Sequence, residues 1–161
     1  MKKLKIYLDT SVVSMLDQPD APERMADTRS FWERIKNGDY DIVISSVVTQ
    51  EIGNCEPEKK RLLTDYLGEI KYEFIEVGGE MVKIAEQLVD LRILKQKSFD
   101  DCRHIAAAIV ANCDAICSWN FKHIVNPKTM SGVKAVTALN GCRDLLIYTP
   151  ASLVKGDEYD S

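Results

Sequence analysis

Four short polar segments hold the side chains in this sequence that are most able to do chemistry. Each follows a short apolar run or opens an apolar helical pattern. In chain order they are Asp9-Thr10-Ser11, then Glu51, then Asp100-Asp101, and finally Asn120 with Lys122 and His123. Three of the segments offer a carboxylate, and the fourth offers an amide oxygen together with a cation and an imidazole.

Carboxylates held close together repel each other unless one is protonated or a cation lies between them. Their hard oxygen ligands favour Mg²⁺ or Mn²⁺ over zinc. Such an ion can activate water, orient an in-line attack and neutralise a leaving oxygen. Phosphodiester hydrolysis therefore fits these residue types better than acyl or hydride transfer. We expect folding to gather Asp9, Glu51 and Asp101 within reach of one cation.

Asp9 and Glu51 each have a competing structural explanation. Asp9 could open a turn after a strand by capping the backbone. Glu51 could be a solvated helix residue, but Val47, Val48 and Ile52 lie on the same side of its helix. A carboxylate on an apolar stripe is costly without a partner, so an inward-facing role for Glu51 is favoured.

Asp101 and Asn120 have structural explanations too. Ser98 and Asp101 have the spacing of a capping box, and an acid suits the first turn of a helix. Asp101 also leads the apolar stripe through Ile105, which turns it toward the protein, and capping does not exclude metal binding nearby. Asn120, taken alone, is better explained as the cap of the turn after Trp119.

The histidines and basic residues near these segments give weaker signals. His104 follows Asp101 at a spacing that could share a metal, but a lone helical histidine before apolar residues more often packs or supports a neighbour. Lys122 and His123 follow the fourth predicted strand and could contact phosphate, and Lys122 is the stronger candidate of the two. The basic residues Lys95, Lys97 and Arg103 could form a modest basic rim near Asp101, or they could be ordinary solvated surface.

Alternating strand and helix patterns must position these segments. Strands are predicted at residues 4–8, 41–45, 72–75, 115–118 and 145–148, and helices at 28–36, 46–53, 57–70, 81–94, 98–113 and 127–140. This alternation predicts a three-layer α/β/α domain with a central, mainly parallel five-stranded sheet. Ligands of such sheets bind beyond the carboxyl ends of the strands, where the polar segments fall. We expect one domain over residues 1–154 and a polar, frayed tail over 155–161.

Composition limits the class of protein. A chain of 161 residues with 45% hydrophobic and 29% charged residues is typical of one globular domain. The five cysteines form no CxxC or zinc-type spacing, which favours reduced thiols. No signal peptide or membrane span is predicted, so we expect a soluble, cytoplasmic protein without a membrane partner.

Neither the net charge nor the search for known phosphate-binding and nucleophile motifs argues against a metal-dependent nuclease. The net charge of −4 argues against a simple cationic surface for nucleic acid, although a carboxylate cluster itself adds negative charge. The sequence contains no GxGxxG, GxxxxGK[ST] or GxSxG.

The four segments together resemble the PIN-domain nucleases, and among them the VapC-type toxins of bacterial and archaeal toxin–antitoxin pairs. The matching stretches are IYLDTSVV at 6–13, ISS at 44–46 leading to Glu51, DCRHIAAA at 101–108 and SWNFKH at 118–123. Each stretch is short, but their order and separation cover residues 4 to about 150.

The resemblance implies that Asp9, Glu51 and Asp101 bind metal and that the hydroxyl of Thr10 or Ser11 supports the site. It also implies an RNA substrate, Mg²⁺ or Mn²⁺ as cofactor, a homodimer, and inhibition by an antitoxin protein. One departure is Asn120, where many members of the family carry a fourth acid. The amide removes one negative charge, which favours one metal over two.

Three functions compete on this evidence. The first is a metal-dependent endoribonuclease, with water activated by metal on Asp9 and Asp101 and positioned or deprotonated by Glu51. The second is a PIN-fold module that binds RNA or a partner protein with little or no cutting, as Asn120 suggests. The third, a phosphatase or receiver-like domain phosphorylated on Asp9, lacks the usual adjacent acid, because Tyr7 and Leu8 precede Asp9.

Overall fold

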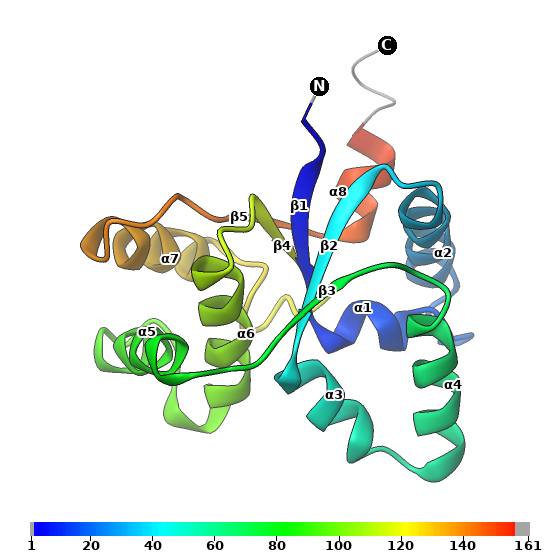
Figure 1. Cartoon of the computed structure of the whole chain (residues 1–161), viewed down its shortest axis with the longest axis horizontal. Coiled ribbons are helices and arrows are strands. Elements are labelled where there is room, and N and C mark those ends of the chain that lie inside the picture. Colours follow the sequence, from blue (N-terminus) through cyan, green and yellow to red (C-terminus); the bar gives the residue numbers. More distant parts are fainter. Residues whose placement is uncertain (1, 157–161) are drawn as a thin grey trace.

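The computed structural model describes residues 2–156 and contains one central sheet of five parallel strands (Figure 1). The strands are β1 (Leu4–Leu8), β2 (Tyr40–Ser45), β3 (Glu73–Ile75), β4 (Ala115–Cys117) and β5 (Leu146–Tyr148), in the spatial order β3-β2-β1-β4-β5. Every neighbouring pair is parallel, which confirms the predicted sheet and sharpens "mainly parallel" to parallel throughout.

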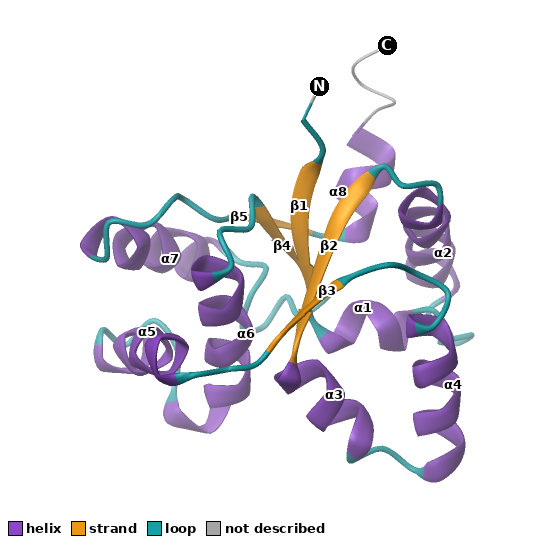
Figure 2. Ribbon diagram, in the orientation of Figure 1, coloured by secondary structure: helices purple, strands orange, loops and turns teal. Residues whose placement is uncertain are grey.

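Helices cover both faces of this sheet, as a three-layer domain requires. They are α1 (Thr10–Met15), α2 (Pro22–Lys36), α3 (Ser46–Gly53), α4 (Pro57–Leu67), α5 (Gly79–Asp90), α6 (Phe99–Val110), α7 (Pro127–Leu139) and α8 (Pro150–Lys155), with a 3₁₀ turn at Gln96–Ser98. Figure 2 shows α5, α6 and α7 on one side of the strands and α1, α2, α4 and α8 on the other. No helix within residues 2–156 is long and apolar enough to cross a membrane.

The central strand β1 fixes where the site lies. Ile6, Tyr7 and Leu8 are fully buried, as expected for a parallel strand covered on both faces. In register, Tyr7 lies beside Val43 of β2 and Ile116 of β4. The residues that directly follow β1, β2 and β4 therefore emerge as neighbours at one edge of the sheet.

The helices differ from the sequence-based expectations in two unpredicted elements and in several bounds. Helices α1 and α8 were not predicted, and α2 begins at Pro22 rather than at residue 28. Helices α5 and α6 end at Asp90 and Val110 rather than at residues 94 and 113, shortly before Arg92 and Asn112, which have positive φ angles. Proline in the first turn and Glu23 beside it are ordinary start signals for α2. Most of the expected tail lies outside the described residues, but Lys155 is the last residue of α8, with its ammonium 3.2 Å from carboxylate oxygens of Glu23 and Asp27.

Candidate functional site

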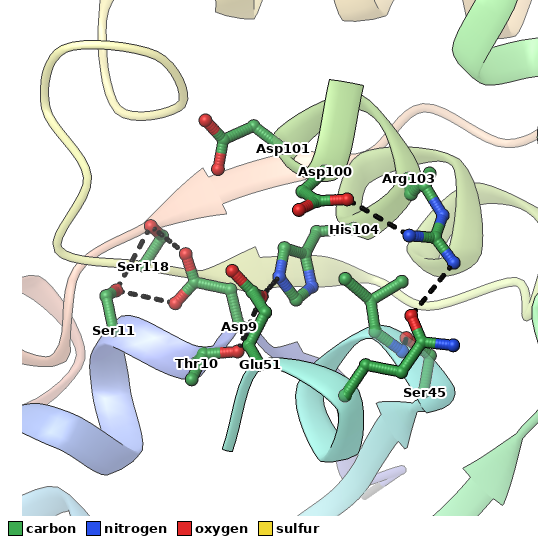
Figure 3. A network of polar contacts seen from close by, with 12 residues as sticks. Asp9, Thr10, Ser11, Ser45, Glu51, Asp100, Asp101, Arg103, His104 and Ser118 are labelled. Atoms are coloured by element: carbon green, nitrogen blue, oxygen red, sulfur yellow. Dashed lines mark hydrogen bonds and ion pairs between the residues drawn. The ribbon is translucent and has the colours of Figure 1, made fainter. Parts of the chain in front are cut away.

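The polar segments predicted from the sequence meet beyond the carboxyl ends of β1, β2 and β4 (Figure 3). Asp9 follows β1 directly, and Ser118 follows β4. Glu51 lies on α3, the helix that leaves β2, and Asp101 lies in the first turn of α6. Segments more than a hundred residues apart in the sequence thus form one polar site.

Asp9 lies at the bottom of this site, with only 3% of its surface exposed. One carboxylate oxygen accepts a 2.6 Å hydrogen bond from Ser11 Oγ, and the other accepts a 2.6 Å bond from Ser118 Oγ. Asp9 occupies the N-cap position of α1, but its side chain makes no capping bond, so helix capping does not explain it. Burial raises the pKa of Asp9, against the opposing effects of His104 and the two serine bonds.

The two serines that hold Asp9 are themselves held by the backbone after β4. Ser11 Oγ accepts a 2.9 Å bond from the Trp119 N–H, and Ser118 Oγ accepts a 2.9 Å bond from the Asn120 N–H. The supporting role that the family resemblance gave to Thr10 or Ser11 is divided in the structure. Ser11 bonds to Asp9, whereas Thr10 donates a 2.8 Å bond to Glu51.

Glu51 is set in a different environment from Asp9. Its Oε1 accepts the Thr10 bond and lies 2.5 Å from Nε2 of the buried His104. Burial alone would raise the pKa of Glu51, but the bond and charge of His104, the Thr10 hydroxyl and Arg103 together lower it. Glu51 is therefore the carboxylate in this site whose charged form the protein favours.

His104 connects Glu51 to a buried chain of hydroxyl groups. Its Nδ1 lies 2.7 Å from Tyr7 Oη, which lies 2.7 Å from Ser45 Oγ, and that oxygen accepts a 3.1 Å bond from the Val47 N–H. At each contact one group can donate a hydrogen bond and the other can accept it, so a continuous chain of hydrogen bonds runs from Ser45 through Tyr7 and His104 to Glu51.

Asp101 and its neighbour Asp100 point to different surroundings. Asp101 Oδ2 lies 2.9 Å from His123 Nδ1, with 20% of its side chain exposed. Asp100 is exposed and accepts a 3.0 Å bond from Arg103. Burial raises the pKa of Asp101 and the charge of Glu51 adds to this, while His104 and His123 oppose it.

The capping box considered as a structural explanation for Ser98 and Asp101 is not formed. Ser98 makes no side-chain capping bond, and its hydroxyl instead lies 3.4 Å from His123 Nε2. The cause is local: Ser98 closes the preceding 3₁₀ turn, and its φ of −103° and ψ of 27° differ from the extended backbone usual for a capping residue.

The loop after β4 joins the fourth polar segment to the rest of the site. Asn120 Oδ1 accepts a 3.0 Å bond from the His123 N–H, which is the turn-capping role considered for it from the sequence. His123 in turn contacts Asp101. Lys122 is exposed on the same loop.

The carboxylates influence one another but do not converge on a single point. Asp9 and Glu51 each interact electrostatically with Asp101, yet each acid is turned to its own hydroxyl or imidazole partners. Within residues 2–156, no group of three or more His, Cys, Asp or Glu side chains is arranged so that it could hold a metal ion. The expected gathering of three acids around one cation is thus not present in the described chain.

The donor chemistry nevertheless fits a hard divalent cation. Burial disfavours the charged forms of Asp9 and Asp101, and the Asp9–Asp101 and Asp101–Glu51 interactions are repulsive. A cation would offset both effects, and carboxylate oxygens are the ligands that Mg²⁺ and Mn²⁺ prefer. A carboxylate has about four lone-pair positions, so Asp9 could keep its two serine bonds while it binds an ion. The side chains of Asp9 and Asp101 would have to move so that both reach the same ion.

Several residues of this site were not singled out from the sequence. They are Tyr7, Ser45 and Ser118. Ser118 could have been found, because it follows β4 directly at the edge where ligands bind. Tyr7 and Ser45 gave no signal, because a tyrosine or serine in a buried strand has no distinctive pattern.

Comparison with known proteins supports the fold and nothing finer. No protein-family model matches the sequence, and no curated protein matches it. Among solved structures, this chain is similar to a chain from the crystal structure of VapBC2 of Rickettsia felis, which was bound to a DNA fragment from the VapBC2 promoter. The two chains superpose with a TM-score of 0.57 and share 14% sequence identity. The match covers 91% of this chain and 98% of that chain, so this protein has a VapC-like PIN fold, which confirms the resemblance at the level of fold.

Proposed function

We propose that this chain, with its VapC-like PIN fold, is a metal-dependent endoribonuclease and the toxin of a toxin–antitoxin pair. The observation that carries the proposal is Asp9, a buried carboxylate at the carboxyl end of the central strand with Glu51 and Asp101 beside it. A buried acid with a raised pKa at this edge of a parallel sheet is typical of a functional site.

In this proposal Asp9 and Asp101 hold Mg²⁺ or Mn²⁺, with Glu51 at the side of the ion. When bound, the ion would supply Lewis acidity and neutralise the charge that develops on the phosphate. Ser11 and Ser118 keep Asp9 oriented through their 2.6 Å bonds. Because its pKa is lowered, Glu51 is ionised at neutral pH and can position the attacking water by accepting a hydrogen bond from it.

Basic groups around the acids would contact the RNA backbone. Lys122 and the half-buried His123 lie on the loop after β4, and Lys95 and Lys97 are exposed just before α6. Phosphate contacts of this kind position a nucleic acid without reading its sequence. Arg103 is a weaker candidate, since it already bonds to Asp100 and Gln50.

Partners follow from the same proposal. The Rickettsia felis neighbour is a VapBC2 assembly on promoter DNA. We infer an antitoxin protein for this chain as well, a homodimeric toxin, and action on cytoplasmic RNA. Co-purification of the chain with the product of an adjacent gene, and the mass of the purified protein in solution, test the first two inferences.

The proposed activity is tested with purified protein and labelled RNA in Mg²⁺ or Mn²⁺. Metal-dependent stabilisation of a transition state is worth several kcal/mol, so Asp9→Asn and Asp101→Asn should each lower the cleavage rate by more than about 100-fold. Asp100→Asn is the matched control, because Asp100 is the next residue but is exposed and paired with Arg103. Cleavage that persists in EDTA, or full activity of Asp9→Asn, would remove this mechanism.

A second candidate is a PIN-fold module that binds RNA or a protein without cutting. Two observations favour it: Asn120 caps a turn where many PIN domains carry an acid, and the carboxylates of residues 2–156 form no ready-made metal cluster. Calorimetric titration with Mn²⁺ separates the candidates. The nuclease must bind the ion through Asp9, whereas the module need not bind it at all.

A further inference from the structure

A cation–aromatic stack lies next to the candidate site, formed by Arg24, Trp119 and Phe121. The Arg24 guanidinium carbon lies 5.0 Å from the centre of the Phe121 ring and 5.6 Å from that of Trp119. The two rings are 6.2 Å apart at their centres and inclined by 56°. This stack joins α2 to the loop after β4, which runs in yellow beside α6 in Figure 1.

The members of the stack differ in how exposed they are. Trp119 is 7% exposed, and its indole N–H donates a 2.8 Å bond to Thr28 Oγ1 of α2. Phe121 is 43% exposed, and Arg24 is also exposed. The hydrogen bond of Trp119 already connects the loop to α2. The exposed ring of Phe121 is therefore not needed to hold the loop in place.

The loop that carries Phe121 contacts two of the site carboxylates, one through a residue before Phe121 in the sequence and one through a residue after it. Three residues before Phe121, Ser118 donates a hydrogen bond to Asp9, and two residues after it, His123 contacts Asp101. Three residues span at most about 10 Å, so Phe121 lies on the same loop within that backbone distance of the residues that contact these carboxylates.

We propose that Arg24 and Phe121 form a subsite that stacks one unpaired base of the RNA next to the cleaved phosphodiester. Aromatic rings and guanidinium planes are the groups on which proteins stack splayed-out bases, with little dependence on base identity. A base inside a duplex has both faces covered by its neighbours, so the subsite selects single-stranded RNA. This inference rests on the proposed function and names two residues that would contact a base of the substrate.

Binding measured without cleavage tests the subsite. Fluorescence anisotropy of a labelled single-stranded oligoribonucleotide is recorded in EDTA, with the same oligonucleotide in a duplex for comparison. The Phe121→Ala variant loses one stacked base, so it should bind the single strand roughly 5- to 100-fold more weakly than the wild type. Phe74→Ala is the matched control, because Phe74 is also 43% exposed but lies on the edge strand β3, and its binding should equal that of the wild type.

Two further variants separate stacking from charge and from folding. Arg24→Lys keeps the charge but loses the planar group, so it should weaken single-strand binding without changing the slope of affinity against salt concentration. Phe121→Trp keeps an aromatic face and should retain affinity. Wild-type affinity in Phe121→Ala, or duplex RNA bound as tightly as single strands, would overturn the subsite.

The subsite and the nuclease can fail separately. Metal-dependent cleavage that is equally fast in wild type and Phe121→Ala, with equal affinity, would overturn the subsite and leave the nuclease standing. Single-strand binding that depends on Phe121 in a protein that never cuts RNA would support the subsite and remove the nuclease.

Discussion

Asp9 and Glu51 lie in the same site, yet the protein treats their charges in opposite ways. Burial raises the pKa of Asp9 more than two serine hydroxyls and His104 can lower it. For Glu51 the balance is reversed, because His104, Thr10 and Arg103 outweigh burial. Two carboxylates with divergent environments are able to take different roles, Asp9 as a metal ligand and Glu51 as an ionised group that positions water.

The chain of hydrogen bonds behind Glu51 predicts a measurable cost for removing a single hydroxyl. Tyr7→Phe leaves His104 Nδ1 and the Ser45 hydroxyl without the Tyr7 partner in a fully buried place. A buried group left unpaired costs about 1–3 kcal/mol, and we expect this loss in the free energy of unfolding measured with urea. Tyr40→Phe, which keeps its ring packed on Phe31, is the control and should change stability much less. Equal stabilities of wild type and Tyr7→Phe would show that the hydroxyl chain is not maintained in solution.

At the scale of single residues, the sequence indicated which acids lie at this edge of the sheet but not which groups hold them. Asp9, Glu51 and Asp101 were singled out because they follow strands or open a helix at the edge where parallel sheets bind ligands. The capping role considered for Ser98 is absent, because a sequence motif cannot report the backbone angles of Ser98. Tyr7 was missed because its hydroxyl meets His104 only after 97 intervening sequence positions are folded together.

At the scale of elements, helix α7 packs closely on the segment that follows α5. A Cβ atom added at Gly132 would lie 2.5 Å from two side-chain carbons of Ile93 and 2.7 Å from a third. Ile93 is itself nearly buried, so it has little room to give way. A glycine is required here for close approach of the two segments rather than for helix formation.

Gly132→Ala should therefore destabilise the protein although alanine favours helices. Overpacking costs typically about 1–3 kcal/mol, which exceeds the gain of up to about 1 kcal/mol in helix propensity. Thermal or urea unfolding measures the net loss. Ile93→Ala in the same chain removes the clashing carbons, so the double variant should be more stable than the sum of the single effects predicts. Strictly additive effects would contradict this packing.

The same scale explains which elements could be predicted. Strands β1, β2 and β4 were found because they are largely buried and form apolar runs. The edge strands β3 and β5 are partly exposed and were found from their aromatic and β-branched residues. Helices α1 and α8 were missed because each has only six residues, too few to display a helical period. The start of α2 was missed although Pro22 and Glu23 mark it, because the segment before Thr28 has few apolar residues.

For the molecule as a whole, the site acids make stability depend on pH. A carboxyl group whose pKa is raised on folding stabilises the protein at low pH, and this contribution is lost as the pH rises through the folded pKa. Asp9 and Asp101 belong to this class, starting from an ordinary value of 3.8. Glu51 acts in the opposite sense, because its pKa is lowered and its contribution is lost on acidification.

Asp9→Asn isolates one of these contributions. At low pH the variant replaces a neutral carboxyl by a neutral amide, whereas at neutral pH it removes a disfavoured buried charge. We expect the stability of Asp9→Asn relative to wild type to improve as the pH rises from about 4 to 7, measured by urea unfolding in EDTA. A difference between the two proteins that stays constant over this range would show that Asp9 is not strained by burial.

The nuclease mechanism depends most on Asp9 and Asp101, which must move close enough together to share a divalent cation. Crystals grown with Mn²⁺ and measured for anomalous scattering test this most directly. We expect one ion bound by Asp9 and Asp101 with Glu51 alongside, and no second ion, because Asn120 supplies no charge. The absence of manganese between the two acids at saturating concentration would contradict this prediction.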